Sequence, residues 1–441
     1  MKVQSHWLAT LGVAFLFGCG GGGGNSVGNG PDPDPNPTPP VSTDLSRLPN
    51  GLGVDIRQSI APNSEWDLLA AGGFNLVRFN MHWSSIEKQP GVYHFKQDGQ
   101  DYDALVTAMA NRGIRILFIL AYDNPLYDGG YTPFSATGRA AFARFAAACA
   151  SRYREKSIIW EIWNEPNIDQ FWRRSPNDKQ PPAESYAELA KQTLAAMRQA
   201  DPNAFIVGPA VGPLDDPEVE HFISTLGENG ALAQFDAISV HPYRHEPPET
   251  VLFDYDNLRS LIRQHTGTDK PIFNTESGRS TGIYPGVPRI SEEEQAERLV
   301  RTFLTDVMAG VQLTVWFNWA NLGSNPDDIH SNFGVVTQAR QPKAAYTAAK
   351  QAAQFLEGFR LAETLDRGTS GAYALRFDRN GETRLALWGP ESSRAPVVVR
   401  IPAGTWQVLD WQGKALGTLL ASGEATMIDL TSSPIFLKQA N

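Results

Sequence analysis

The 441-residue sequence contains only two cysteines, Cys19 and Cys149. Cys19 lies in an N-terminal segment with the features of an export signal, so the rest of the chain offers no pair for a disulfide. Cys149 stands in an alanine-rich run, where we expect a small buried helix residue rather than a reactive thiol. The stability of the folded part must therefore come from its hydrophobic core.

Blocks of five or six Lys or Arg are absent, and acidic residues outnumber basic ones by 48 to 38, which gives a formal net charge of -10. This balance repels a phosphate backbone, so we expect no nucleic-acid partner. Hydrophobic residues make up 41% and charged residues 20% of the chain. These proportions are those of an ordinary globular protein.

The uncharged stretch near the N-terminus, from Trp7 to Gly18, is too short to span a bilayer. It follows the positive Lys2 and is typical of a signal peptide. The residues Leu16-Phe17-Gly18-Cys19 resemble a bacterial lipobox, which implies that Cys19 becomes the lipidated first residue of the mature protein. Residues 1–19 are thus expected to direct export to the periplasm with membrane anchoring through Cys19. Ordinary cleavage with release into the periplasm is the alternative.

Residues 20–44 have a composition that cannot bury a core. They begin with five glycines, Gly20 to Gly24, and continue into a segment in which every second residue from Pro31 to Pro39 is proline. Such a segment favours extended polyproline II and is expected to act as a tether between a lipid anchor and a folded body.

Residues 45–359 alternate short apolar, β-branched runs with longer amphipathic helical patterns, which is typical of βα units around a parallel sheet. Eight such units predict a (β/α)8 barrel. A doubly wound sheet is the alternative fold, but the Gly-rich phosphate turn usual after its first strand is missing. The expected strands begin at Gly53, Asn75, Ile114, Ile158, Ala204, Ala237, Pro271 and Leu313, and the clearest helices cover 138–154, 185–200 and 291–308.

Residues 360–441 change to period-two patterns with an Asn380-Gly381 turn, which predicts a small antiparallel β-sandwich domain. The expected strands are 372–377, 383–388, 397–401, 406–410 and 426–430. This domain is expected to cover and stabilise part of the barrel. Independent carbohydrate binding is the other interpretation, and the sequence does not separate the two.

Two glutamates stand where predicted strands end. Pro166 ends the fourth strand directly after Glu165, and Gly278 releases the chain shortly after Glu276 in the seventh. In a (β/α)8 barrel these positions share one face and converge across its mouth. One carboxyl that stays protonated and one that stays ionised suit the cleavage of a glycosidic bond.

The motifs Trp163-Asn164-Glu165-Pro166 and Thr275-Glu276-Ser277 resemble those of the clan of (β/α)8 retaining glycoside hydrolases, and within it most closely family 39. The likeness covers most of the barrel. It implies Glu165 as general acid/base and Glu276 as nucleophile, with carboxyl groups about 5 to 5.5 Å apart. Neither a metal nor another cofactor is required by this chemistry.

The clan pattern also implies roles for other residues at the barrel mouth. Asn164 would bind the sugar 2-hydroxyl, Arg78 would keep Glu276 ionised, and Tyr243 would hold an oxygen of Glu276. His241 would meet a sugar hydroxyl, and Trp316 would stack on a sugar ring. For the aromatic residues, a place in the core is the alternative. Further substrate-binding candidates are His82, Trp83, Tyr122 and Trp319.

Other polar residues near these positions are interpreted as structural. Glu161 lies deeper in the fourth strand and is expected to be a paired interior charge. His241 and His245 have the spacing of helical zinc ligands, but Pro242 forbids that helix. Asp55 and Asp123 also end strands, and interior polar layers explain them as well as substrate contacts do.

One family member, an endoglycosidase of a biofilm exopolysaccharide, resembles the chain in length, glutamate placement and C-terminal β domain. This resemblance implies an endo-acting cut in a neutral, mannose-containing exopolysaccharide during its biosynthesis or turnover. Polysaccharide export machinery is then a possible partner. The rival hypothesis is a non-catalytic carbohydrate-binding scaffold of an export complex.

Overall fold

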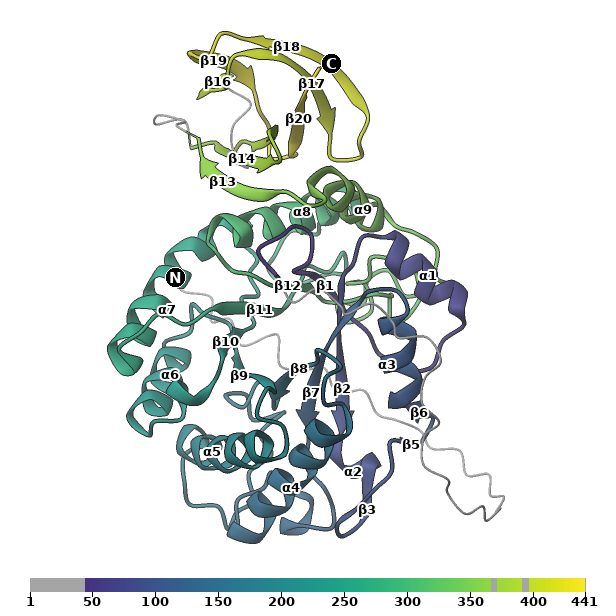
Figure 1. The fold of residues 1–441 in the computed structure, drawn as a ribbon, viewed down its shortest axis with the longest axis vertical. Helices are drawn as coiled ribbons and strands as arrows, with labels where there is room; N and C mark the ends of the chain where they lie inside the picture. The colour runs from purple at the N-terminus through teal and green to yellow at the C-terminus, as the bar shows by residue number, and fades with distance from the viewer. Residues whose placement is uncertain (1–43, 366–370, 391–395, 441) are drawn as a thin grey trace.

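The computed structural model describes residues 44–365, 371–390 and 396–440. The chain forms a closed barrel of eight parallel strands wrapped by helices, followed by antiparallel β-sheets that pack on one side of it (Figure 1). This confirms the predicted (β/α)8 barrel with a C-terminal β region. The predictions for residues 1–19, for Cys19 and for the tether up to residue 43 lie outside the described residues.

The barrel strands follow one another around the barrel in chain order. Inward-pointing apolar side chains such as Leu117, Ile159 and Phe273 fill the interior, so the barrel is a packed core and not a pore. The open face of the barrel is the end at which the carboxyl ends of the strands lead into the loops. The strands are β1 (Leu52–Asp55), β2 (Leu76–His82), β7 (Arg115–Ala121), β8 (Ile159–Ile162), β9 (Phe205–Val211), β10 (Ala237–Val240), β11 (Ile272–Ser277) and β12 (Thr314–Trp316).

Several of the barrel helices begin at a side chain that caps the first turn. The Ser135 side chain accepts a hydrogen bond from the Gly138 amide, so α4 starts two residues before the predicted start. Ser291 and Glu294 form a reciprocal capping box that opens α8. The helices around the barrel are α1 (Asn63–Ala71), α3 (Tyr102–Ala110), α4 (Ala136–Arg152), α5 (Pro182–Ala200), α6 (Pro217–Glu228), α7 (Val251–Thr266), α8 (Glu292–Met308) and α9 (Ala344–Leu356).

The connection from β2 to α3 is elaborated. It holds the one-turn helix α2 (Trp83–Ile86) and two small hairpins, one made of β3 (Glu87–Gln89) with β4 (Val92–Tyr93), the other of β5 (Lys96–Gln97) with β6 (Gln100–Asp101). Three short 3-10 helices, η1 (Asp128–Gly130), η2 (Leu232–Gln234) and η3 (Pro248–Thr250), lie in other connections.

The C-terminal β region contains a six-stranded antiparallel sheet in the order β13-β14-β15-β20-β17-β18 and a separate β16-β19 pair. Asn380 and Gly381, both with positive φ, form the predicted two-residue turn between β14 and β15. The strands are β13 (Arg360–Thr364), β14 (Tyr373–Arg379), β15 (Glu382–Trp388), β16 (Pro396–Arg400), β17 (Gly404–Asp410), β18 (Ala415–Ala421), β19 (Ala425–Asp429) and β20 (Ile435–Gln439).

The β region shares a core with the barrel. The rings of Phe355 in α9 and Phe436 in β20 lie 4.8 Å apart between centroids, and the Trp388 indole donates a 2.7 Å hydrogen bond to Glu249 in η3. Buried residues of both parts belong to one continuous hydrophobic cluster. This packing is consistent with the expected stabilising role, whereas carbohydrate binding by the β region stays a prediction.

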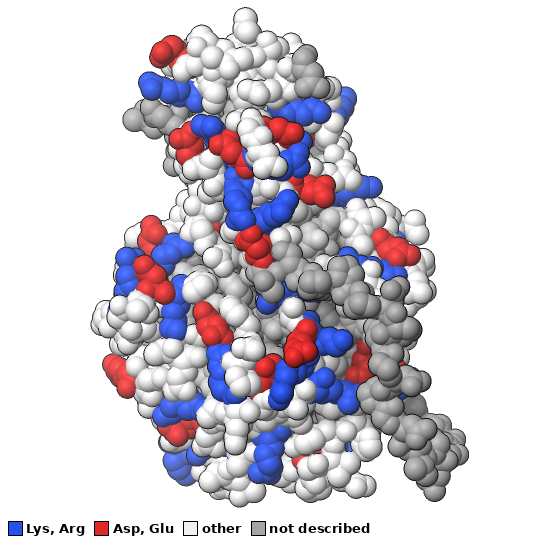
Figure 2. All heavy atoms as spheres, viewed as in Figure 1, with Lys and Arg blue, Asp and Glu red and all other residues white. Residues whose placement is uncertain are grey.

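The surface of the molecule carries both signs of charge. Figure 2 shows Lys and Arg interspersed with Asp and Glu on the face seen there, without a broad patch of either sign. Among the helices of the described residues, none is both long and apolar enough to cross a membrane.

Candidate active site

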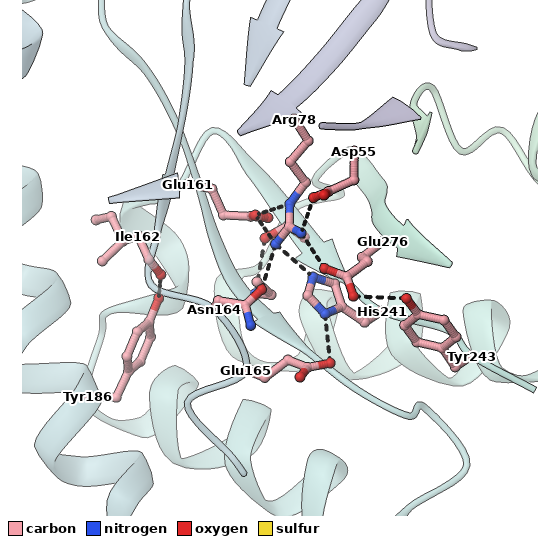
Figure 3. Close-up of polar contacts among 12 residues, drawn as sticks. Asp55, Arg78, Glu161, Ile162, Asn164, Glu165, Tyr186, His241, Tyr243 and Glu276 are labelled. Carbon is pink, nitrogen blue, oxygen red and sulfur yellow. Dashed lines mark hydrogen bonds and ion pairs between the residues drawn. The ribbon is translucent and has the colours of Figure 1, made fainter. Parts of the chain in front are cut away.

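Arg78 stands at the centre of the barrel mouth. Strand β2 points its side chain inward, where it is 1% exposed, and all three guanidinium nitrogens are engaged (Figure 3). Nε donates to Glu161 at 2.8 Å, and Nη2 donates to Asn164 at 2.7 Å. Nη1 donates to Glu276 and, at 3.4 Å, to Asp55. One buried cation thus organises residues from four strands and the loops that follow them.

Glu276 lies near the end of β11, where the register against β12 shifts. Its two oxygens have different partners, since one is held by Arg78 and the other accepts a 2.8 Å hydrogen bond from the Tyr243 hydroxyl. Burial would raise the pKa of this carboxyl, but the nearby charges of Arg78 and Arg57 and the Tyr243 hydrogen bond outweigh burial and lower it. Glu276 is therefore held ionised.

Glu165 reaches the same space from the loop after β8. Trp163 and Glu165 both have positive φ, which turns the chain sharply, and the Glu165 amide donates to the Ala210 carbonyl at 3.1 Å. Burial raises the pKa of Glu165, the charge of Glu276 raises it further, and a hydrogen bond from His241 opposes the shift without cancelling it. Of the two carboxyls, Glu165 is thus the one that keeps its proton to the higher pH.

His241 links the two halves of the site. Its Nδ1 lies 2.9 Å from Glu165 and its Nε2 lies 3.2 Å from Nη2 of Arg78. Because a guanidinium can only donate, Nε2 must accept and Nδ1 must carry the proton that goes to Glu165. Both ring nitrogens are therefore occupied within the protein. This placement differs from the expected contact between His241 and a sugar hydroxyl.

The two carboxyl groups lie close together. One ligand atom each from Glu165, His241 and Glu276 lies within 4.8 Å of the others. This spacing is near that of retaining glycosidases and well below the 6.5–9.5 Å typical of inverting ones. The three side chains also form a set that could hold a metal ion. However, Arg78 already contacts both His241 and Glu276, and its charge would oppose a second cation there.

Asp55 and Glu161 form the layer beneath. Glu161 is fully buried and paired with Arg78, as predicted for an interior charge. Burial raises the pKa of Asp55 to about 6, and its pairing with Arg57 and Arg78 limits the rise. Asp123 lies apart and pairs with Arg173 at 2.6 Å.

The structure places two of the predicted tryptophans, Trp316 and Trp83, in the core. Trp316 points out of the barrel and donates to the Phe333 carbonyl at 3.1 Å, because Val315 takes the inward position in β12. Trp83 opens α2 instead of extending β2 and is buried against Phe145 in α4. Both are core residues.

Trp319 is 3% exposed, but it lines a cavity beside β1 and β12 and stays a candidate for substrate contact. Its indole donates to Glu65 at 2.9 Å, and its ring packs edge-on against Phe74. By contrast, His82 and Tyr122 remain half-buried at the mouth, with ring centroids 6.1 Å apart. These two also stay candidates for substrate contact.

Sequence reasoning missed several residues of the site. Arg57 lies over the Phe317 ring at 4.7 Å and pairs with Asp55 at 3.3 Å. His330, on the loop after β12, lines the pocket that contains both glutamates. Arg57 could have been identified from the sequence, because it follows the strand-ending Asp55 by two residues. No local pattern marks His330, because a long irregular loop brings it over the mouth.

The remaining wall of this pocket is mostly apolar. It is formed by Ile168, Gly212, Pro213, Tyr243, Tyr284, Ile329 and Phe333. Two close carboxyls whose pKa values are shifted in opposite directions, between apolar walls, are the arrangement that cleavage of a glycosidic bond requires.

Comparison with known proteins agrees. Residues 52–323 match the family model described as Cellulase (glycosyl hydrolase family 5). The chain belongs to this family, which confirms the prediction that it is a glycoside hydrolase, whereas membership of family 39 stays a prediction.

Matching relatives and solved structures are distant in sequence. A β-xylosidase of Geobacillus stearothermophilus is 24% identical over 44% of this chain and 40% of its own length, so the match spans well under half of that relative. A family 39 glycoside hydrolase from Bacteroides cellulosilyticus WH2 has a TM-score of 0.74 at 22% identity, over 90% of this chain and 82% of its own. A GH30 endoxylanase from Clostridium papyrosolvens C71 has a TM-score of 0.60 at 12% identity, over 89% and 96%. The two structures show a shared fold.

Proposed function

We propose that the protein is a retaining glycoside hydrolase in which Glu276 is the nucleophile and Glu165 the general acid/base. The observation that carries the proposal is the placement of two carboxyls within 4.8 Å of each other in different surroundings. Glu276 is held by Arg78 and Tyr243, which lower its pKa, whereas burial raises the pKa of Glu165. Two carboxyls set apart in this way can take the ionised and the protonated role of one reaction.

The reaction proceeds by double displacement. Glu276 attacks the anomeric carbon through a free lone pair of its carboxylate, while Glu165 gives its proton to the leaving oxygen. The Nδ1–H of His241 stabilises the resulting Glu165 carboxylate. Glu165 then takes a proton from water as the water attacks the glycosyl-enzyme ester, and Glu276 leaves as a carboxylate again. The amide of Asn164, whose oxygen is held by Arg78, keeps its N–H groups for a sugar hydroxyl.

Two variants separate the proposed roles. Glu276→Gln should abolish turnover of every substrate, because no ester can form. Glu165→Gln should lose polysaccharide cleavage but keep much of the first step on aryl glycosides with good leaving groups, which need no protonation. Glu424→Gln, on the exposed surface of the β region, is the matched control and should behave like the wild type.

A 2-fluoro glycoside tests the nucleophile directly. Mass spectrometry of the trapped enzyme should find the label on Glu276. A label on another residue, or release of the sugar with inverted configuration, would contradict the assignment.

For the substrate, we propose an endo-acting cut in a neutral, mannose-containing exopolysaccharide of a biofilm. The protein resembles PslG, the periplasmic endoglycosidase of the Psl exopolysaccharide operon, and through it family 39, in length, glutamate placement and C-terminal β domain. Space that continues beside the carboxyl pair supports an endo cut. The pocket that contains both glutamates has a volume of about 30 Å³ and is walled by loops that follow β8, β9, β11 and β12. A cavity of about 220 Å³ lined by Arg57, Gln58 and Arg340 lies beside β1 and β12.

The lining of that cavity favours a neutral sugar. Arg57 pairs with Asp55, and Arg340 pairs with Glu65 at 2.6 Å, so the opposite charges there are balanced. Incubation with purified mannose-rich exopolysaccharide, galactomannan and xylan, followed by mass spectrometry, should give oligosaccharide ladders from a mannose-containing polymer. Binding without any product, equal in wild type and both glutamine variants, would favour the carbohydrate-binding scaffold of an export complex.

We further propose that the mature protein is anchored, by a lipid on Cys19, to a membrane that faces the periplasm. The lipobox-like sequence before Cys19 supports this proposal. Metabolic labelling with a palmitate analogue should mark the wild type, and Cys19→Ser should move the protein from the membrane to the periplasmic fraction. A soluble, unlabelled wild type would contradict the proposal.

A further inference from the structure

A groove on the outer surface of the barrel lies between α6 and α7, which run side by side in Figure 1. Its volume is about 580 Å³, within the range of ligand sites in proteins. Each barrel helix runs back from the catalytic face, so the first turns of α6 and α7 lie at the mouth and the groove descends from there. It is lined by Leu214, Asp215, Ile223, Phe253, Asn257 and Gln264, among others.

We propose that this groove binds the part of a neutral glycan chain that extends beyond the leaving-group side of the catalytic pocket. The inference deepens the proposed function and rests on it. Because Glu165 protonates the leaving oxygen, the leaving portion of the chain must pass on the side of Glu165, over the loops after β8 and β9.

The loop after β9 connects the two sites. Gly212 and Pro213 form part of the wall of the catalytic pocket, and Leu214 and Asp215 directly after them line the groove. A second link comes from the loop after β10. Arg244 follows Tyr243 in the chain and pairs with Asp254 of the groove at 3.0 Å. A chain leaving the pocket over Pro213 would therefore meet the groove at once.

The exposed edge of α7 has the groups that bind sugars. Phe253, Asn257, Ser260 and Gln264 recur at helical spacing on one face, over roughly 16 Å at 1.5 Å per residue. The Phe253 ring is 71% exposed although it is large and apolar, as expected of a platform for the apolar face of a sugar. Among the described residues, none forms a hydrogen bond with the side-chain amides of Asn257 and Gln264, so both are available to hydroxyl groups.

The charge of the groove selects the class of glycan. Its lining includes the carboxylates Asp215, Asp216 and Glu220 but no Lys or Arg, and its fourth carboxylate, Asp254, is paired with Arg244. Carboxylates accept hydrogen bonds from hydroxyl groups and repel a polyanion. The groove therefore suits a neutral chain and not a uronate or sulfated polymer.

Affinity electrophoresis tests the inference in the full-length protein. The Glu276→Gln background prevents digestion of the gel, which contains mannose-rich exopolysaccharide, galactomannan or the anionic polymer alginate. Adding Phe253→Ala should weaken binding to a neutral polymer about tenfold, whereas adding Leu420→Ala should not change it. Leu420 is the matched control, because it is 79% exposed and lies on β18, outside the groove.

The results that would overturn the groove differ from the results that would overturn the proposed function. Any one of three results would overturn the groove as a site for a neutral glycan. The first is equal affinity with and without Phe253, the second is no retardation in either neutral polymer, and the third is equally strong retardation in alginate. The proposed function fails instead if the wild type, with Phe253 in place, releases no oligosaccharide. In the active enzyme, Phe253→Ala should also lower about tenfold the ratio of kcat/KM for polymer to kcat/KM for an aryl glycoside.

Discussion

At the scale of single residues, Tyr243 controls the charge of the proposed nucleophile. Its hydroxyl donates a 2.8 Å hydrogen bond to Glu276, and this bond helps to lower the pKa of that carboxyl. A hydrogen bond to a charged group contributes about 1.5–3 kcal/mol. Tyr243 should therefore influence both the rate and the pH dependence of the reaction.

Tyr243→Phe should reduce kcat/KM about ten- to hundredfold and move the acidic limb of its pH profile upward by roughly one unit. The sign follows because loss of the donor raises the pKa of Glu276, which must be ionised to attack. Tyr127→Phe is the matched control, since Tyr127 donates to the distant Glu87 at 2.7 Å. An unchanged acidic limb in Tyr243→Phe would show that the hydroxyl does not tune Glu276.

The two glutamates could be predicted from the sequence because Pro166 and Gly278 mark where their strands end. The tryptophans could not. A residue near a strand end points into the barrel or away from it according to strand alternation and the exact boundary, and a shift of one residue reverses the side. Trp316 is one such case, since Val315 occupies the inward position.

At the scale of secondary-structure elements, Asp306 fastens α8 to its neighbours. This fully buried carboxyl accepts 2.8 Å hydrogen bonds from Asn274 in β11, Thr314 in β12 and Tyr255 in α7. Burial nevertheless raises its pKa to about 6, and the three donors limit the rise. The contact is thus stabilising, but its strength depends on pH.

Asp306→Asn should reduce the free energy of unfolding, because an amide cannot accept all three bonds. A carboxyl with a higher pKa in the folded state contributes stability that is fully present below pH 4 and is lost as the pH rises through about 6. The destabilisation should therefore be larger at pH 4 than at pH 7.5, by up to about 3 kcal/mol for a shift of this size. Urea unfolding at both pH values measures the difference, and a larger loss at pH 7.5 would contradict the prediction.

Most elements of the barrel were predictable because apolar runs and amphipathic helices alternate regularly. In the β region, strands β13, β18 and β20 were missed. Strand β13 is almost wholly exposed, and β18 is an edge strand with few buried residues, so neither needs the alternation that identifies a half-buried strand. Tertiary pairing, which the sequence does not display locally, defines these strands.

At the scale of the whole molecule, the barrel and the β region should unfold together. Phe436 from β20 is buried against Phe355 in α9, and the cluster that contains them extends through the barrel. Phe436→Ala should destabilise the protein by about 3–5 kcal/mol. The temperature at which activity is lost and the temperature of global unfolding should fall by equal numbers of degrees. Calorimetry with parallel activity assays measures both.

Met427→Ala is the control for this experiment, because Met427 is 70% exposed on the β16-β19 pair. It should leave both temperatures unchanged. If Phe436→Ala lowered only a separate calorimetric transition, with activity surviving past it, the two parts would be energetically independent and the β region would be free to serve another purpose.

The crowded surroundings of Arg78 also restrict how this sequence can vary over evolutionary time. Its buried guanidinium is shared among Asp55, Glu161 and Glu276, so loss of the cation leaves several buried anions uncompensated. A single replacement of Arg78 or Glu161 is therefore destabilising, and we expect it to persist in evolution only if a second charged residue changes at nearly the same time. We expect Arg78 and Glu161 to be inherited as a linked pair even in descendants that no longer cleave a glycosidic bond.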